Sequence, residues 1–413
     1  MKILIKNIGL MQDGKVTEHK NIAVEDKYIK EFPENPKEEE YDEIIDGHDM
    51  LAMPGLVNTH THVAMTLFRS YADDMALMDW LQNKIWPAED HLDDDIVYWG
   101  STLAFAEMIR GGTTSFCDMY MFNLARGLAG IGPNGQKGID ENVELYKNWN
   151  GAGDGRFKVM MGPHAPYTCP PDYIRKVRDV AEKYDMPIHI HLSETKGEVE
   201  NCEKEYHMTP IALMDSLGLF ERPTLAAHCV HVTDDDIRIM KEKHVCAAHN
   251  PASNLKLASG IAPVPKMRKA GITVGIGTDG ASSNNKLDMF AEMRLTALIH
   301  KAANYDPFAI TAKEAVDMAT KDGAKCLGYD NLGELKEGFL ADIILIDRTG
   351  FHWKPRFDSV SLAVYAGNSM DVDTVIINGR PVMEHKELLT IDTEKMDAEV
   401  KRVTEKLYAF TKK

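Results

Sequence analysis

Several side chains in this chain could do chemistry together, because each follows a short apolar segment. Alternate residues of a strand point to the same side, so the two histidines of His60-Thr61-His62, at the end of the strand-like run Leu51–His62, could hold one cation. A His-x-His pair alone is weak support, since a strand can carry two histidines for packing. The further candidates are His164, His191, Glu194, His228 and Asp279.

Three imidazoles and one carboxylate suit a divalent transition metal such as zinc, with water completing the coordination shell. A cation of this kind lowers the pKa of bound water from ~15.7 towards ~7, so that it can attack at neutral pH. The predicted ligands are His60, His62, His191 and Asp279.

Glu194 follows the predicted ligand His191 by three residues, which suits a proton shuttle that faces the metal without binding it. The alternative is a carboxylate that only favours the N-terminus of a following helix. His228 is predicted to orient or polarise the attacking water. His189 lies two residues deeper in the same segment as His191 and is assigned to the interior.

For these residues to meet, the segments before them must end at one edge of a sheet. Short apolar segments alternate with amphipathic helices, which predicts parallel strands in a (β/α)8 TIM-type barrel with its active site at the carboxyl ends. An open doubly wound sheet is the alternative, but the Gly-rich phosphate loop expected there is absent. The strand candidates are 55–58, 113–118, 124–128, 158–162, 187–191, 224–227, 245–248 and 273–277.

Both ends of the chain read as short strands separated by turns such as Asp13-Gly14 and Asn378-Gly379. We therefore expect residues 1–52 and 340–413 to form one small β-sandwich domain, and residues 53–339 to form the barrel.

One interval does not fit a regular barrel. The stretch between Asp118 and Arg126 is too short for a helical crossover, which needs a dozen or more residues. The second barrel helix is therefore expected to be shortened or missing. The segment Gly127–Gly155, rich in Gly and Asn, is predicted to form a long loop at the mouth of the barrel.

The composition bounds the class of protein. A chain of 413 residues with 44% apolar and 27% charged residues suits a globular protein with a full core. A net charge of −17 disfavours binding to nucleic acid or to an anionic membrane. The six cysteines have no CxxC spacing, so reduced, buried thiols are expected. No signal peptide or spanning segment is visible, and the expected location is cytoplasmic.

Four spaced motifs resemble the amidohydrolase superfamily and, within it, the 5-methylthioadenosine/S-adenosylhomocysteine deaminases. The likeness covers nearly the whole chain. The motifs are PGLVNTHTH at 54–62, HIHLSET at 189–195, HNPASN at 249–254 and GTDG at 277–280.

The resemblance implies further site residues. Members with two metals usually carry a bridging lysine after the fourth strand, and none stands at Met160–His164, so one metal is implied. Glu89 would accept hydrogen bonds from two ribose hydroxyls, His164 would meet the purine, and Arg126 would reach the distal end of the substrate. Zinc is favoured, with iron or manganese as alternatives, and the resemblance also suggests a homo-oligomer.

The implied reaction is hydrolytic deamination at C6 of an adenine-containing nucleoside, which gives the inosyl product and ammonia. The small-molecule substrate would be S-adenosylhomocysteine, 5-methylthioadenosine or a related adenosine. Deamination of guanine or another heterocycle, or hydrolytic dechlorination, is the alternative within the superfamily. A metal-free binding protein on the same barrel is an alternative from another class, which the short segment after Asp118 keeps open.

Overall fold

The computed structural model of this chain describes residues 1–119 and 133–409. These fall into two compact units, one of Met1–Phe116 with Ile276–Lys413 and one of Cys117–Gly275. We call them the terminal unit and the central unit. Across the described residues, none of the helices combines the length and the apolar character needed to cross a membrane.

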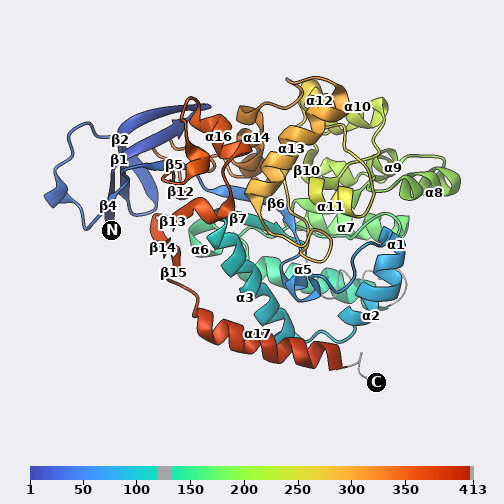
Figure 1. Cartoon of the computed structure of the whole chain (residues 1–413). Coiled ribbons are helices and arrows are strands. Elements are labelled where there is room, and N and C mark those ends of the chain that lie inside the picture. The colour runs from blue at the N-terminus through green and yellow to red at the C-terminus, as the bar shows by residue number, and fades with distance from the viewer. Residues whose placement is uncertain (120–132, 410–413) are drawn as a thin grey trace. The chain divides into compact units, whose positions relative to one another are not determined.

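The terminal unit holds a nine-stranded sheet to which both ends of the chain contribute, in the order β15-β14-β13-β12-β5-β1-β2-β3, with β4 paired to β1. Figure 1 shows its early strands in blue and its late strands in red. The two ends join where β12 pairs antiparallel with β5. The strands are β1 (Lys2–Gln12), β2 (Lys15–Glu25), β3 (Tyr28–Glu31), β4 (Glu43–Asp46), β5 (Met50–Pro54), β12 (Ile343–Asp347), β13 (Val372–Ile377), β14 (Arg380–Glu384) and β15 (Glu387–Leu388).

Alternating apolar residues of these strands form one buried cluster. Ile3 and Ile5 of β1 pack with Ile343 and Leu345 of β12, and all four side chains are fully buried. Because side chains of a strand alternate between faces, this spacing places the residues on one side of the sheet. Burying each such side chain contributes about 1.5–3 kcal/mol. The shared core therefore links the two ends of the chain.

The predicted single strand Leu51–His62 is two strands that belong to different sheets, which corrects the expectation. β5 ends at Pro54, and β6 (Leu56–Thr61) pairs with β7 (Thr113–Asp118) instead. The break falls at Gly55, where a Cβ atom would lie 2.2 Å from the hydroxyl oxygen of Thr114. Only glycine fits this close approach. The apolar run is continuous in the sequence, so the change of sheet gave no signal in hydrophobicity.

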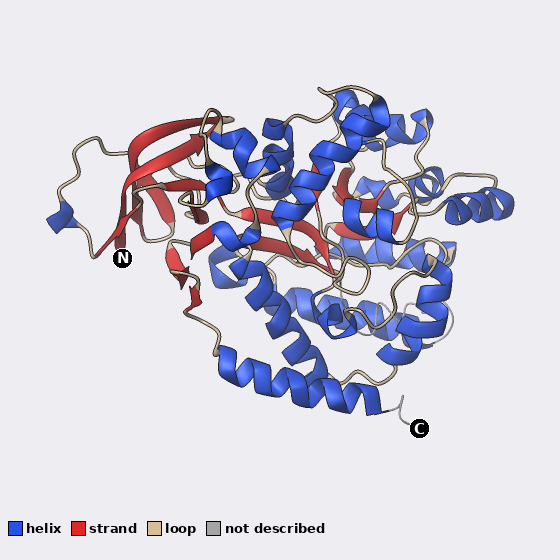
Figure 2. Cartoon of the chain, viewed as in Figure 1, coloured by secondary structure: helices blue, strands red, loops and turns tan. Residues whose placement is uncertain are grey.

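A helical segment before α3 changes its hydrogen-bonding pattern in the middle. Between α1 and α2, residues Leu81–Ile85 form a π-helical turn, in which the N–H of Trp86 bonds to the carbonyl of Leu81. Pro87 follows directly and has no N–H to donate to the preceding turn. The helices of the terminal unit are α1 (Leu77–Trp80), α2 (Trp86–Glu89), α3 (Asp94–Arg110), α13 (Met289–Asn304), α14 (Ala312–Ala319), α15 (Lys321–Cys326), α16 (Ser359–Tyr365) and α17 (Thr393–Leu407). Figure 2 draws the helices of both units in blue.

The central unit is built on parallel strands separated by helices, as the sequence predicted. β9 lies between β8 and β10 and pairs in parallel with both, and β11 follows β10 in the sheet. The strands are β8 (Ile188–Leu192), β9 (Thr224–His228), β10 (Cys246–His249) and β11 (Val274–Ile276). The helices are α5 (Pro133–Trp149), α6 (Ala152–Gly155), α7 (Pro171–Tyr184), α8 (Lys196–Tyr206), α9 (Pro210–Ser216), α10 (Asp234–Glu242), α11 (Pro251–Lys256) and α12 (Val264–Ala270).

Two predictions for the central unit were wrong. The segment 158–162 is not a strand, because only Met161 forms a β-bridge, to Ile188. Part of the predicted loop Gly127–Gly155 is helix α5, whose Ile139, Asn142 and Val143 share a buried face.

A side chain of α5 explains why this helix is held in place. The amide of Asn142 donates to the carbonyl of Met160 at 3.1 Å and accepts from the N–H of Gly162 at 3.2 Å. These two hydrogen bonds hold the residues on either side of Met161 against helix α5. They also satisfy a carbonyl and an N–H group that would be hydrogen-bonded to a neighbouring strand in a regular sheet. The predicted third strand, 124–128, lies outside the described residues, as does most of the interval between Asp118 and Arg126, so the expectation of a shortened or missing second barrel helix stays a prediction.

The fold class is confirmed as α/β, with a β-sheet formed by both ends of the chain. The boundaries proposed for the sandwich and barrel domains stay a prediction. All six cysteines are free; four are buried, and Cys117 and Cys246 are partly exposed.

Candidate functional site

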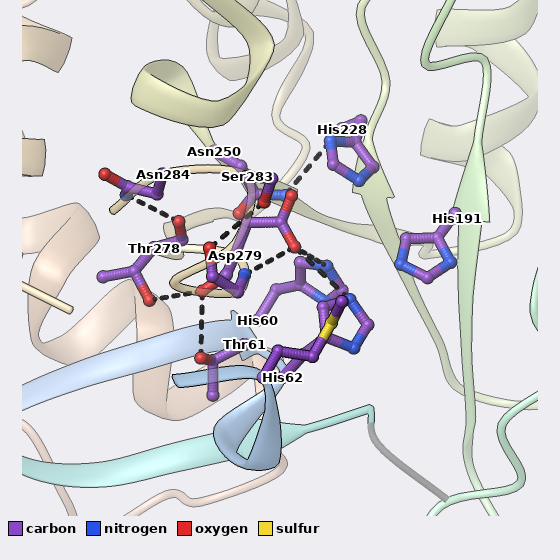
Figure 3. Close-up of polar contacts among 12 residues, drawn as sticks. His60, Thr61, His62, His191, His228, Asn250, Thr278, Asp279, Ser283 and Asn284 are labelled. Atoms are coloured by element: carbon purple, nitrogen blue, oxygen red, sulfur yellow. Dashed lines mark hydrogen bonds and ion pairs between the residues drawn. The ribbon is translucent and has the colours of Figure 1, made fainter. Parts of the chain in front are cut away.

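In the terminal unit, two imidazoles converge on one carboxylate oxygen. The Nε2 atoms of His60 and His62 each lie 3.3 Å from Oδ1 of Asp279. Figure 3 shows both rings turned towards this carboxylate. His60 is fully buried, and the Asp279 and His62 side chains expose only 7% and 13% of their surface. We call these three residues the His-His-Asp cluster.

The cluster is positioned by hydrogen bonds between the end of β6 and the turn after β11. The N–H of Asp279 donates to the carbonyl of His60 at 2.9 Å, and the hydroxyl of Thr61 donates to the carbonyl of Asp279 at 3.0 Å. Asp279 has a left-handed backbone, with φ of 61°. A non-glycine residue in this conformation is uncommon, and such residues concentrate at functional sites.

A second pair of bonds holds the neighbouring residues. The side-chain oxygen of Asn58 accepts from the N–H of Thr278 at 3.0 Å, and its NH2 group donates to the Thr278 hydroxyl at 2.7 Å. Both residues are fully buried. The sequence therefore places Asn58 and Thr278 where they lock the two segments that carry the His-His-Asp cluster.

The charge of Asp279 is stabilised by its neighbours. Burial alone raises the pKa of this carboxyl group, but the contacts to His60 and His62 outweigh burial and hold the pKa well below its usual range. An ionised carboxylate between two imidazole nitrogens is a donor set that suits a divalent cation such as zinc.

In the central unit, His191 stands near the end of β8 and has a defined tautomer. Its Nδ1 donates to the backbone carbonyl of His164 at 2.8 Å, so the lone pair of the neutral ring is on Nε2. Metal-binding histidines usually donate their other ring N–H in this way. The two rings lie with centroids 4.8 Å apart, and Nδ1 of His164 lies 2.8 Å from the hydroxyl of Thr168.

Glu194 and His228 form a buried pair in the same unit. Oε2 of Glu194 lies 3.7 Å from Nε2 of His228, and the two side chains expose 5% and 1% of their surface. Nδ1 of His228 donates to the side-chain oxygen of Asn254 at 2.8 Å. Ser259 donates to Oε1 of Glu194 at 3.4 Å. A buried carboxylate that faces an imidazole can take up and release a proton.

Glu198, a buried acid beside Glu194 in the central unit, was not predicted from the sequence. Its two carboxylate oxygens accept from the backbone N–H groups of Ser193 and Glu194, each at 2.8 Å. Burial raises the pKa of Glu198 to about 7, although these hydrogen bonds oppose the change. The available signal was the Thr195-x-x-Glu198 spacing of a helix capping box.

Three further residues that the sequence analysis singled out lie away from these contacts or outside the described residues. His189 is buried, and its Nδ1 donates to the carbonyl of Leu225 at 2.8 Å, so it packs within the central unit. Glu89 is half-buried at the end of α2 in the terminal unit. Arg126 lies outside the described residues.

Comparisons with known proteins agree with this chemistry. A model of the amidohydrolase family matches residues 51–382. A 5-methylthioadenosine/S-adenosylhomocysteine deaminase from Dictyoglomus thermophilum is 51% identical over 97% of this chain and 98% of its own length.

Two solved structures have a fold similar to that of this chain. An adenosine deaminase from Xanthomonas campestris with bound zinc is 33% identical, with a TM-score of 0.91 over 98% of both chains. An atrazine chlorohydrolase from Arthrobacter aurescens complexed with zinc has a TM-score of 0.90 over 97% of this chain and 100% of its own. At 24% identity, the second structure supports the fold alone.

Proposed function

Because this chain belongs to the amidohydrolase family, we propose that it is a metal-dependent deaminase of adenine-containing nucleosides. Its substrates would be S-adenosylhomocysteine, 5-methylthioadenosine or related adenosines, and its products the inosyl compound and ammonia. The observation that carries this proposal is the 51% identity to a 5-methylthioadenosine/S-adenosylhomocysteine deaminase over nearly the full length of both chains. The chain thus acts as a hydrolase on the C–N bond of a cyclic amidine.

The donor atoms support one divalent cation bound by His60, His62, His191 and Asp279. In the terminal unit, two imidazole nitrogens meet one carboxylate oxygen. In the central unit, the hydrogen bond from Nδ1 of His191 leaves Nε2 able to bind. Zinc is the favoured ion and iron or manganese are the alternatives. When bound, such a cation would act as a Lewis acid and would thereby lower the pKa of water by several units.

The residues of the chain then have separate tasks in the reaction. His228 and Asp279 hold the attacking water by hydrogen bonds. Glu194 takes a proton from this water and delivers it to ring N1, which makes C6 more electrophilic. Attack at C6 gives a tetrahedral intermediate that carries a hydroxyl and an amino group. The hydroxyl proton then passes to the amino group, the C–N bond breaks, and ammonia leaves behind the C6 carbonyl of the inosyl product. The Glu194–His228 distance of 3.7 Å and the burial of both side chains support this proton transfer.

Substrate contacts are proposed from the same family. Glu89 would accept hydrogen bonds from the two ribose hydroxyls, and His164 would contact the purine. The half-buried state of both residues leaves part of each side chain accessible to a ligand. Arg126 would contact the group attached at the 5′ position of the ribose.

We expect the metal-loaded protein to prefer nucleosides over free bases. A site that hydrogen-bonds substrate hydroxyls rejects analogues that lack them, so kcat/KM for S-adenosylhomocysteine, 5-methylthioadenosine or adenosine should exceed that for guanine by about 100-fold or more. Ammonia release from these four compounds measures this preference. Activity on guanine alone would make the chain a guanine deaminase, and activity on none of them would favour a binding protein.

A further inference from the structure

Glu198 is a buried acid that the proposed reaction does not use. It lies in the first turn of α8 and exposes only 7% of its surface. Ionisable residues are rarely buried to this extent unless their polar atoms have partners. The partners of Glu198 are therefore the guide to its role.

The carboxylate of Glu198 binds the backbone N–H groups of two consecutive residues, Ser193 and Glu194, and we call this contact the clamp. Oε1 accepts from the N–H of Ser193 and Oε2 from the N–H of Glu194, each at 2.8 Å. Ser193 has a left-handed backbone with φ of 52°, a conformation that needs support from its surroundings in a non-glycine residue. The two hydrogen bonds provide such support at the turn between β8 and α8.

The clamp is itself anchored to the helix. The N–H of Glu198 donates to the hydroxyl of Thr195, the N-cap residue of α8, at 3.2 Å. In an ordinary capping box the glutamate would instead reach back to the N–H of the N-cap residue. Here the carboxylate extends further, to the two residues before Thr195. This departure from the usual motif directs the side chain to Glu194.

We propose that Glu198 is a positioning residue that holds Glu194 in the orientation needed for proton transfer. The inference rests on the proposed function, in which Glu194 carries the proton. The held backbone directs the Glu194 side chain towards Nε2 of His228, at 3.7 Å, and the hydroxyl of Ser259, at 3.4 Å. Only a carboxylate of this length offers an acceptor to each of the two N–H groups, because a glutamine would oppose one of them with its NH2 group.

The test compares Glu198→Gln with Glu203→Gln in the metal-loaded full-length protein. Glu203 is exposed on the same helix, so its variant removes the same charge without touching the clamp. We expect Glu198→Gln to lower kcat by about 10- to 100-fold, as small misplacements of catalytic groups do, with KM and metal content within about twofold of wild type. Glu203→Gln should leave all three unchanged.

Hydrogen–deuterium exchange of the amides at Ser193 and Glu194 provides a readout that does not depend on activity. These amides should be protected in the wild type and in Glu203→Gln, and should exchange faster in Glu198→Gln. If Glu198→Gln does not fold, Glu198→Asp takes its place, because the shorter side chain cannot reach both N–H groups. Unchanged exchange, or faster exchange with unchanged kcat, would overturn the proposal.

The same measurements separate this inference from the proposed function. If the wild type deaminates none of the nucleosides, the proposed function fails, and with it the catalytic meaning of the clamp, whatever the exchange shows. If the wild type is active and Glu198→Gln keeps its kcat, only the positioning role fails. A fall in melting temperature with unchanged kcat per bound metal would likewise assign Glu198 a purely structural role.

Discussion

Glu194→Gln is expected to lower kcat by about 10²- to 10⁴-fold, the usual contribution of a general acid–base group, while the bound metal stays near the wild-type amount. Glutamine has nearly the same shape, so it can still accept the hydrogen bond from Ser259. It cannot take up a proton at neutral pH, so transfer from water to ring N1 would stop. Steady-state kinetics and metal analysis on the same preparation measure both quantities.

A matched control keeps this result specific to Glu194. Glu200→Gln removes an acid from the exposed side of α8, where its side chain exposes 61% of its surface, and should keep wild-type kcat. Loss of metal from Glu194→Gln would mean that this residue holds the ion site together. Retained kcat would remove it from the proton path and leave only the helix-terminus role that the sequence also allowed.

His62→Ala is expected to lose most of the bound metal and to reduce activity by at least about 100-fold, since even residues behind a metal ligand contribute 10–100-fold. The substitution removes one of the two imidazoles that meet Oδ1 of Asp279. The side chain of His62 is 13% exposed, whereas His60 is fully buried, so truncation at His62 disturbs the core less. Elemental analysis after dialysis, with circular dichroism to monitor folding, gives the result.

His48→Ala is the matched control, because the His48 side chain exposes 70% of its surface on the terminal unit. It should keep the wild-type metal content and activity. A folded His62→Ala variant that still binds the wild-type amount of metal would contradict the proposed ligand set. Full activity in a metal-free His62→Ala variant would contradict metal dependence itself.

Much of the fold could be predicted from the sequence because its strands follow simple periods. Alternate residues of β1, such as Ile3 and Ile5, face one core, and β8 and β9 are short, fully buried strands that precede helices. The fold of the relatives confirms the class that these patterns predicted. Local patterns of this kind depend on which face of an element is buried, and that information is present in each segment alone.

The errors arose where tertiary contacts decided the structure. The split at Gly55 depends on Thr114, which approaches it from a distant part of the chain. Helix α5 was predicted as a loop because its Gly and Asn residues have low helix propensity, yet the burial of Ile139 and Val143 stabilises it. The prediction relied on the Gly and Asn content of the segment and gave less weight to the helical spacing of its apolar residues. In the structure, the packing of those apolar residues outweighs the low helix propensity of Gly and Asn.

The candidate site also combines residues that could be predicted from the sequence with one that could not. Residues such as His60, His191 and Asp279 could be proposed because each lies at or just after the carboxyl end of a strand, which is where barrels place functional groups. Glu198 could not, because a glutamate in the first turn of a helix is usually a cap. Only the direction of its carboxylate, towards Ser193 and Glu194, distinguishes it from a cap.

The central claim is that this chain deaminates adenine-containing nucleosides by adding water at C6. The most direct test incubates the metal-loaded protein with S-adenosylhomocysteine in water enriched in the heavy isotope of oxygen, and analyses the products by mass spectrometry. We expect one heavy oxygen atom in the inosyl product for each ammonia released. An unchanged substrate, or a product that keeps its amino group, would contradict the account.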